Sequence, residues 1–165
     1  YDGKYIFSDI GYNFLPSEVS AAFALEQLKK LKSNIKIREK NFNSMRNFFK
    51  KNYKNYIDLP TQEPGLKTGW LAYPVILKKD KHISRTKLQI FLEKNSIQTR
   101  TIFTGNILRQ PIMKKRFYKK HKDAETNANN IMINGLLLGC HHGLNEKSLN
   151  FMKNKIDLFF KKYVY

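Results

Sequence analysis

The chain has 165 residues, enough for a single domain with a real core, and its 41% hydrophobic and 13% aromatic content excludes a disordered protein. The formal net charge of +18 comes mostly from Lys spread along the chain, so it indicates a solvated basic surface rather than a nucleic-acid-binding motif. The single cysteine excludes a disulfide framework. The sequence has no apolar run of the ~18 residues that a membrane span needs, so we expect a cytoplasmic protein with neither membrane nor nucleic acid as a partner.

The first predicted helix covers residues 17–32. Pro16 suits the first helical turn, because its missing N–H is one that a helix start leaves unpaired, and Ser17 suits the N-cap. Ser and Asn at 33–34 predict a weak break before a second helix over 35–53. These two helices form a long helical entry to the rest of the chain.

The remaining sequence predicts strands that alternate with helices. Pro74 lies inside the best strand, which suggests a sheet edge or a bulge. The pattern predicts a small sheet of about three strands packed by helices, of α/β or α+β class. The expected strands are 70–77, 96–102 and 136–138, and the expected helices are 84–95, 112–118, 123–134 and 145–163.

A GYN motif precedes the first helix. One interpretation is an Ala-rich core helix with a capped start, in which Asn13 only tolerates an unusual backbone angle. The other is that Asn13 projects its amide at a ligand, since a neutral amide beside a helix N-terminus can donate to a phosphate.

Arg100 lies within the second predicted strand, and Asn106 and Arg109 lie in the loop that follows it. The planar guanidinium groups of Arg100 and Arg109 suit a diphosphate, because they form paired, charge-assisted hydrogen bonds. Both are equally compatible with solvated surface arginines. Asn106 can hydrogen-bond a sugar or a phosphate, or it can hold the turn after Gly105.

The turn after the last predicted strand contains Cys140, His141 and His142. Adjacent histidines point in different directions, and no carboxylate or second cysteine stands at metal-ligand spacing, so we expect no metal. We expect Cys140 to be a small packed residue and Trp70 to be a core anchor.

The GYN motif with its helix AAFALEQLKKL resembles the start of the C-terminal half of the DegT-type sugar aminotransferases. These are fold-type I enzymes that use pyridoxal phosphate (PLP) and act on nucleotide-linked keto sugars. The lead-in YDGKYIFS and the block TRTIFTGNILRQP resemble one branch, the nucleotide 4-keto-6-deoxyhexose 3-dehydratases of lipopolysaccharide sugar synthesis. The resemblance covers nearly the whole chain.

The resemblance implies a domain organisation. The chain begins at Tyr1 without Met, so we expect a fragment of a longer protein. Residues 1–16 would be an arm and loop from a PLP-binding large domain, 17–56 would be linking helices, and 57–165 would be the C-terminal small domain of a fold-type I enzyme.

The resemblance also implies a site. Asn13, with Tyr12 packed beside it, would bind the PLP phosphate of the neighbouring subunit of a homodimer. Arg100, Asn106 and Arg109 would shape the pocket for a nucleotide-linked 4-keto-6-deoxy sugar. No catalytic residue is expected in this chain. The Schiff-base Lys of an aminotransferase, or the His that replaces it in a dehydratase, would lie upstream, so the fragment alone should be inactive.

The expected function is therefore the C-terminal part of a PLP-dependent nucleotide-sugar 3-dehydratase in deoxysugar and O-antigen lipopolysaccharide biosynthesis, served by an amino donor or a reductase. The close alternative is an aminotransferase of the same family. The alternative of another class is a non-enzymatic basic module that binds nucleic acid, which strong, salt-sensitive binding to duplex DNA would favour.

Overall fold

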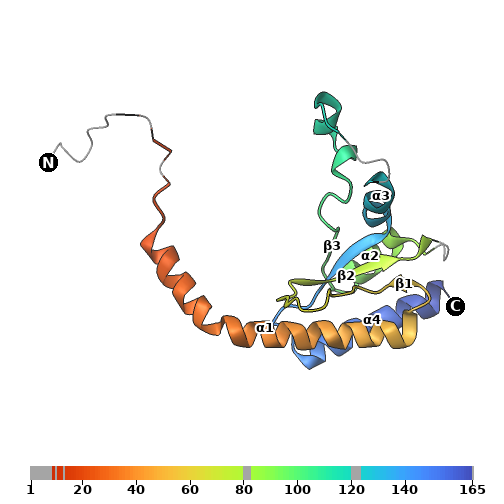
Figure 1. Cartoon of the computed structure of the whole chain (residues 1–165). Coiled ribbons are helices and arrows are strands. Elements are labelled where there is room, and N and C mark those ends of the chain that lie inside the picture. Colours follow the sequence, from red (N-terminus) through yellow and green to blue (C-terminus); the bar gives the residue numbers. More distant parts are fainter. Residues whose placement is uncertain (1–8, 10, 13, 80–82, 120–123, 165) are drawn as a thin grey trace. The chain divides into compact units, whose positions relative to one another are not determined.

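The computed structural model describes residues 9, 11–12, 14–79, 83–119 and 124–164 (Figure 1). It separates into two compact units, Tyr1–Lys32 and Ser33–Tyr165. The expected arm at residues 1–8 and the side chain of Asn13 lie outside the described part of the chain.

The first unit carries the beginning of helix α1 (Glu18–Tyr53). The helix starts where the sequence predicts it, and the Ser17 carbonyl accepts a hydrogen bond from the Ala21 N–H at 3.1 Å. Its large apolar side chains are exposed within this unit, with Val19 81% and Phe23 68% accessible.

Helix α1 is continuous, so the expected break at residues 33–34 is wrong. Ser and Asn each cost only about 0.5 kcal/mol in a helix interior, and neither removes a backbone hydrogen bond as proline does. The following part of α1 is also held by tertiary packing, because Phe42, Met45 and Phe49 are buried in the core. That packing outweighs the weak local preference for a break.

The second unit is built on a four-stranded antiparallel sheet in the order β1-β2-β4-β3. The structural comparisons given below confirm the predicted mixed class with a small sheet, although the strand boundaries differ. Only Thr99–Arg100 of the predicted strand at 96–102 is a strand, and a short strand at Ile57–Asp58 is not among the predicted ones. The strands are β1 (Ile57–Asp58), β2 (Ala72–Leu77), β3 (Thr99–Arg100) and β4 (Gly135–Gly139).

Strand β2 is an interior strand, with β1 on one side and β4 on the other, so it is not a sheet edge as a whole. Pro74 is nevertheless tolerated, because β1 pairs only with Ile76 and Leu77 and does not reach it. At Pro74 the described β pairing is therefore on the β4 side alone, opposite Leu137. The strand is locally edge-like where proline removes its N–H.

Three further helices complete this unit: α2 (Arg85–Lys94), α3 (Ala124–Asn134) and α4 (Glu146–Tyr163). Ser84 and Asn145 cap α2 and α4 as predicted, accepting from Lys87 N at 3.2 Å and Ser148 N at 2.9 Å. The expected helix at 112–118 is instead a 3₁₀ segment, Pro111–Lys115, preceded by another at Ile107–Arg109. No helix in these described ranges is both long and apolar enough to cross a membrane.

The core lies between one face of the sheet and helices α1, α2 and α4. Figure 1 shows the C-terminal half of α1 and α4 running along the same side of the sheet. Trp70 stacks on Phe42 of α1 with ring centroids 3.7 Å apart, which fits its expected role as a core anchor. The buried side chains from the strands are Ile57, Tyr73, Val75, Leu77, Leu136 and Leu138, and those from the helices include Phe49, Leu92, Ile156, Phe159 and Phe160.

Candidate functional site

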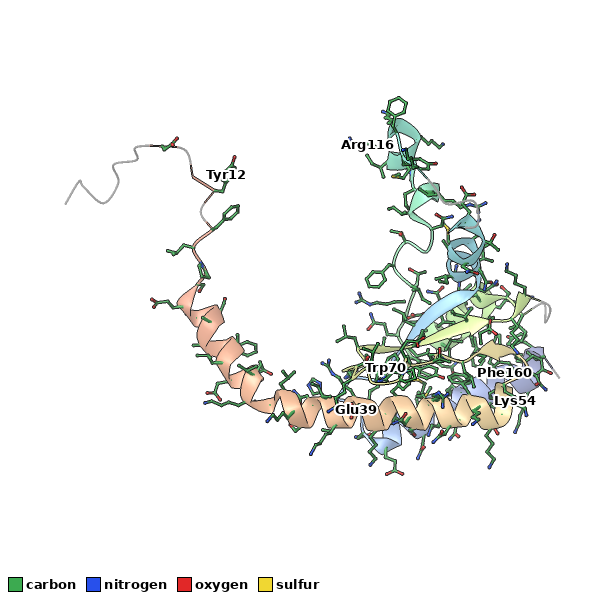
Figure 2. The ribbon with its side chains drawn as sticks, in the orientation of Figure 1. Tyr12, Glu39, Lys54, Trp70, Arg116 and Phe160 are labelled. Atoms are coloured by element: carbon green, nitrogen blue, oxygen red, sulfur yellow. The ribbon has the colours of Figure 1, made fainter. Side chains whose placement is uncertain are left out.

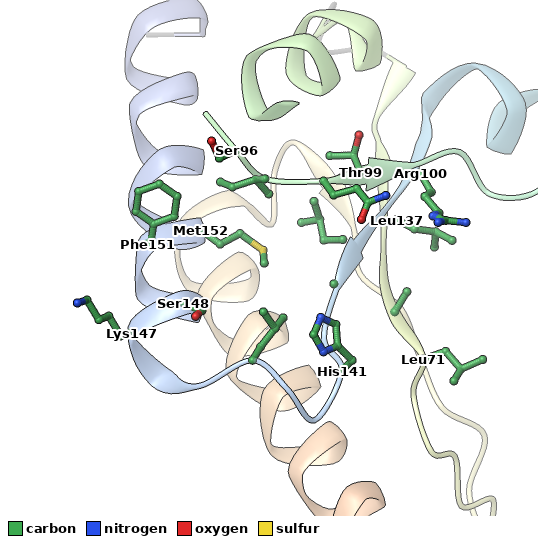
Figure 3. Close-up of a pocket in the computed structure, with 16 residues that line it drawn as sticks. Leu71, Ser96, Thr99, Arg100, Leu137, His141, Lys147, Ser148, Phe151 and Met152 are labelled. Carbon is green, nitrogen blue, oxygen red and sulfur yellow. The ribbon is translucent and has the colours of Figure 1, made fainter. Parts of the chain in front are cut away.

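A pocket of about 590 Å³ lies in the second unit, beside the end of β4 and the first turns of α4 (Figure 3). Most of its lining is apolar, and the cationic side chains in the lining are those of Arg100 and Lys147. The lining residues are Leu71, Ala72, Ser96, Ile97, Gln98, Thr99, Arg100, Leu137, Leu138, Gly139, His141, Leu144, Lys147, Ser148, Phe151 and Met152.

Strand β3 brings Arg100 to this pocket. Thr99 and Arg100 pair with Leu138 and Leu137, so β3 is held against β4. Side chains alternate between the faces of a strand, and Thr99 is buried, so Arg100 lies on the opposite, exposed face. The guanidinium group is therefore available to a ligand.

Glu93 at the end of α2 fixes the start of β3. Its Oε1 atom accepts from the backbone N–H of Thr99 at 2.6 Å and from the Thr99 hydroxyl at 2.7 Å. These hydrogen bonds, the side-chain one first, lower the pKa of Glu93. The Glu93 carboxylate is therefore hydrogen-bonded to Thr99 of β3 and does not form an ion pair with Arg100.

Asn41 of α1 positions the turn on the other side of the pocket. Its amide Nδ2 donates to the carbonyl oxygens of His141 at 3.0 Å and Leu144 at 3.1 Å, and the residue is only 4% exposed. Within the turn, His141 Nδ1 accepts from Gly143 N at 3.2 Å. Sequence reasoning missed Asn41, because an Asn in a helical, Lys-rich stretch carries no sign of a partner 100 residues away.

The remaining residues of this turn are structural. Arg38 Nε donates to His142 Nδ1 at 3.4 Å, and its Nη1 donates to the Gly69 carbonyl at 3.4 Å. Cys140 is fully buried, its Sγ lies 3.4 Å from the Trp70 carbonyl oxygen, and burial raises the pKa of its thiol to about 11. In the part of the chain that the structure describes, no three His, Cys, Asp or Glu side chains form a metal-binding group.

The structure does not bring the three predicted substrate residues together. Arg100 lines the pocket, whereas Arg109 is exposed at the end of the 3₁₀ segment Ile107–Arg109 and does not line it. Asn106 is 2% exposed and caps that segment: its Oδ1 accepts from Leu108 N at 2.9 Å and its Nδ2 donates to Asn129 Oδ1 at 2.9 Å. The oxygen and the nitrogen of the Asn106 side-chain amide therefore both form hydrogen bonds within the protein. Substrate contact by Asn106 and Arg109 stays a prediction.

The predicted cofactor residues belong to the first unit. Tyr12 is 81% exposed, and its ring stacks on Phe14 with centroids 5.6 Å apart (Figure 2). Asn13 is outside the described residues, so its contact with a PLP phosphate also stays a prediction.

A family model described as the DegT/DnrJ/EryC1/StrS aminotransferase family matches residues 1–156. The chain belongs to this family. The resemblance seen in the GYN and GNILRQP motifs is therefore confirmed.

Among curated relatives, the lipopolysaccharide biosynthesis protein RfbH of Salmonella typhimurium is 29% identical over 160 residues, which is 97% of this chain and 36% of that protein. A GDP-4-keto-6-deoxy-D-mannose 3-dehydratase of Yersinia pseudotuberculosis is 37% identical over 131 residues, covering 79% of this chain and 32% of that enzyme. The chain thus spans about a third of the length of these relatives.

Solved structures confirm the fold. A mutant GDP-4-keto-6-deoxymannose-3-dehydratase with bound GDP-perosamine gives a TM-score of 0.78 at 33% identity, over 92% of this chain and 38% of that one. A structure of the same type of enzyme with a trapped PLP-glutamate geminal diamine gives 0.77 with the same identity and coverage.

Proposed function

We propose that the complete protein carrying this chain is a PLP-dependent nucleotide-sugar 3-dehydratase that acts on a 4-keto-6-deoxyhexose in deoxysugar and O-antigen lipopolysaccharide biosynthesis. The proposal is based on how the sequence identities to the curated relatives rank. Two GDP-4-keto-6-deoxy-D-mannose 3-dehydratases are 36% and 37% identical to this chain, whereas two transaminases are 27% and 26% identical. The block ending in GNILRQP supports the same branch.

PLP, when bound, supplies an electron sink for removal of the sugar's 3-hydroxyl group. In this chain Asn13 would hold the cofactor by donating its amide N–H to the phosphate in the neighbouring subunit. Two described features near it in the sequence support the proposal: Tyr12 is 81% exposed, and α1 begins at Glu18, where the unpaired N–H groups of a helix start favour an anion. Replacing Asn13 with Ala in the complete protein should weaken PLP binding.

Arg100 is the residue of this chain that we propose binds the substrate. Its exposed guanidinium lines the pocket, and the carboxylate of Glu93 is engaged by Thr99 rather than by the arginine. A guanidinium can bind a phosphate group of a diphosphate through two parallel charge-assisted hydrogen bonds. The formal net charge of +18 adds a field that steers an anionic sugar nucleotide toward the protein.

The working protein is a cytoplasmic homodimer in which each subunit completes the other's cofactor site. Asn13 is the residue of this chain that crosses between subunits. Replacing the 3-hydroxyl group with hydrogen is a net two-electron reduction, so the complete protein would need an amino donor or a reductase as the source of those electrons.

The second candidate is an aminotransferase on the same class of substrate. It is favoured by a UDP-4-amino-4,6-dideoxy-N-acetyl-beta-L-altrosamine transaminase of Campylobacter jejuni, which is 27% identical over 93% of this chain. The two candidates differ in the upstream residue opposite the cofactor, which is His in the dehydratase and Lys in the aminotransferase.

The test is to add PLP to the complete protein, reduce it with borohydride, and search for a modified lysine by mass spectrometry. Reversibly bound PLP with no pyridoxyl-lysine is the result expected of the dehydratase. A pyridoxyl-lysine upstream of this chain would establish the aminotransferase instead. Absence of PLP binding would reject both.

A further inference from the structure

The segment after the GNILRQP block is strongly basic. Residues 112–119, with the sequence IMKKRFYK, form what we call the basic arm, and they contain no acidic residue. The four cations of the arm are Lys114, Lys115, Arg116 and Lys119. In the part of the chain that the structure describes, no carboxylate forms an ion pair with any of them. The next acidic residues on either side are Glu93 and Asp123, so the stretch 94–122 carries positive charge alone.

The arm also exposes apolar side chains. Phe117 is fully exposed, and Ile112 and Tyr118 are 56% and 46% exposed. Every residue of the arm except Met113 is exposed, and Met113 is only partly buried. Figure 2 shows Arg116 of the arm at a distance from the sheet. Because cationic and apolar side chains are exposed together on one short segment, the arm has the composition of an interaction surface.

The backbone keeps these two kinds of side chain close together. The 3₁₀ helix Pro111–Lys115 covers the first half of the arm, and Arg116 is its C-cap. A 3₁₀ helix rises about 2 Å per residue, so Ile112 and Lys115 are only about 6 Å apart along it. Arg116 directly precedes Phe117. Each of these apolar side chains therefore has a cation within the reach of a Lys or Arg stem.

Three kinds of partner carry the opposite charge: a nucleic acid, an acidic protein and an anionic phospholipid membrane. Proteins that bind single-stranded nucleic acid combine a charged groove with aromatic rings on which bases stack. The arm lines neither the 590 Å³ pocket nor a smaller cavity between α1 and α4. A standard protein interface uses about 20–30 residues a side, far more than this short arm provides. The arm therefore fits neither of these two partners well.

A membrane surface suits both kinds of exposed side chain. Lys and Arg are attracted to the negative surface of a bilayer that contains anionic lipids. Aromatic and aliphatic side chains lie at the boundary between headgroups and acyl chains, which removes them from water. Stacking on bases would cover Phe117 but would leave the aliphatic Ile112 exposed. The combination of both side chains with the cations of the arm therefore favours the membrane.

We propose that the basic arm is a peripheral contact with a membrane that contains anionic phospholipids. The cations of the arm contact the lipid phosphates, and Phe117 and Ile112 enter the boundary with the acyl chains. The expectation of no membrane partner rested on the lack of an apolar span, and a peripheral contact needs no span. The proposal is independent of the proposed function, because none of these residues is assigned to the cofactor or the substrate.

The binding experiment is co-sedimentation of the complete protein with two kinds of vesicle, phosphatidylcholine alone and an equimolar mixture of phosphatidylcholine and phosphatidylglycerol. The protein should bind the mixed vesicles and not the neutral ones. Added salt should weaken the binding, because salt screens exposed charges. Limited trypsin digestion then locates the contact. The mixed vesicles should slow cleavage after the cations of the arm, and the neutral vesicles should not.

A charge variant, a matched control and an apolar variant test the residues. The charge variant replaces three consecutive cations of the arm: Lys114→Gln, Lys115→Gln and Arg116→Gln. It should weaken binding to the mixed vesicles by about a hundredfold, because each basic residue at an anionic surface contributes about fivefold. The control removes the same charge from exposed lysines at the end of α1, and its effect should stay below about threefold. Its substitutions are Lys50→Gln, Lys51→Gln and Lys54→Gln.

Phe117→Ser, the apolar variant, should weaken the binding by about tenfold, because it removes the side chain that enters the acyl boundary. Circular dichroism melting of each variant separates lost binding from lost folding. Equal losses in the charge variant and the control would overturn the proposal, because net charge alone would then explain the binding. Tryptic cleavage of the arm that mixed vesicles do not slow would also overturn it.

Two further outcomes would identify a different situation. A complete protein that loads PLP but binds neither kind of vesicle would overturn the membrane contact and leave the proposed function standing. Binding to single-stranded DNA that the charge variant abolishes, without binding to mixed vesicles, would overturn it in favour of a nucleic acid.

Discussion

Gly105 lies directly against Met132 of α3. A Cβ atom added at Gly105 would stand only 2.5 Å from the Met132 Cα atom, and the glycine has a φ of +67°. This contact places the loop of the GNILRQP block against the helix that leads into β4. The glycine of that block is therefore required by packing as well as by backbone conformation.

Gly105→Ala should lower the free energy of unfolding by about 2–4 kcal/mol, because it combines a left-handed backbone angle with a clash against helix backbone. Gly65→Ala is the matched control: Gly65 has a φ of +80° but nothing within 4 Å of the added Cβ. It should cost only about 1 kcal/mol. Urea denaturation of both variants measures the difference. Equal losses would show that the Met132 contact adds nothing.

Asn106→Ala should destabilise the chain by about 1–2 kcal/mol, since it removes an N-cap and leaves Asn129 with an unpaired oxygen. Asn106→Asp keeps the acceptor for Leu108 N, but it replaces the donor to Asn129 with a second acceptor and buries a carboxylate. We therefore expect the urea midpoint of the Asp variant to lie below that of the wild type, as that of the Ala variant does. A midpoint for Asn106→Ala within error of the wild type would contradict the structural role.

Tyr73 and Tyr53 make a matched pair in the core. The Tyr73 hydroxyl has no hydrogen-bond partner among the described residues, and its burial raises the pKa of the phenol. Tyr53 instead donates to Asp157 Oδ1 at 2.5 Å. Tyr73→Phe should leave the free energy of unfolding unchanged or raise it, whereas Tyr53→Phe should lower it by about 1.5–3 kcal/mol. The reverse order in thermal melts would be inconsistent with this packing.

Cys140 should be inert in the folded chain. Burial raises its thiol pKa from 9.0 to about 11, so the neutral thiol is the form that the fold favours. The raised thiol pKa therefore contributes to the free energy of unfolding. This contribution is fully present below pH 9 and is lost as the pH rises toward 11. At pH 8 the thiolate fraction should be about a hundredfold below that of the unfolded chain. Iodoacetamide labelling with and without urea measures this, and equal rates would contradict it.

Local signals in the sequence predicted much of the fold. Ser84 and Asn145 cap helices because their short side chains reach back to the backbone, and that preference is visible without tertiary information. The break expected at 33–34 was wrong because packing of Phe42 and Phe49 decides the helix, and packing is not local. Strand β3 is shorter than its apolar pattern suggests, since pairing with β4 covers only Thr99 and Arg100.

The sequence pointed to a residue of the candidate site only where its side-chain type suggests a ligand. Arg100 could be proposed from its residue type, and it lines the pocket, while its contact with a substrate stays a prediction. Lys147 could not be distinguished from the many other lysines, because only the fold brings it to the pocket shared with Arg100. Asn41 and Glu93 act through backbone groups of other segments, and no sequence spacing encodes those contacts.

We propose above that the complete protein removes the 3-hydroxyl group of a nucleotide-linked 4-keto-6-deoxyhexose. The most direct measurement is mass spectrometry and NMR of the sugar product after incubation with PLP, glutamate and GDP-4-keto-6-deoxymannose, or its UDP or dTDP counterpart. A 3-deoxy product that keeps its 4-keto group is the predicted result. A product that carries a 4-amino group and keeps its 3-hydroxyl would contradict the account and identify an aminotransferase.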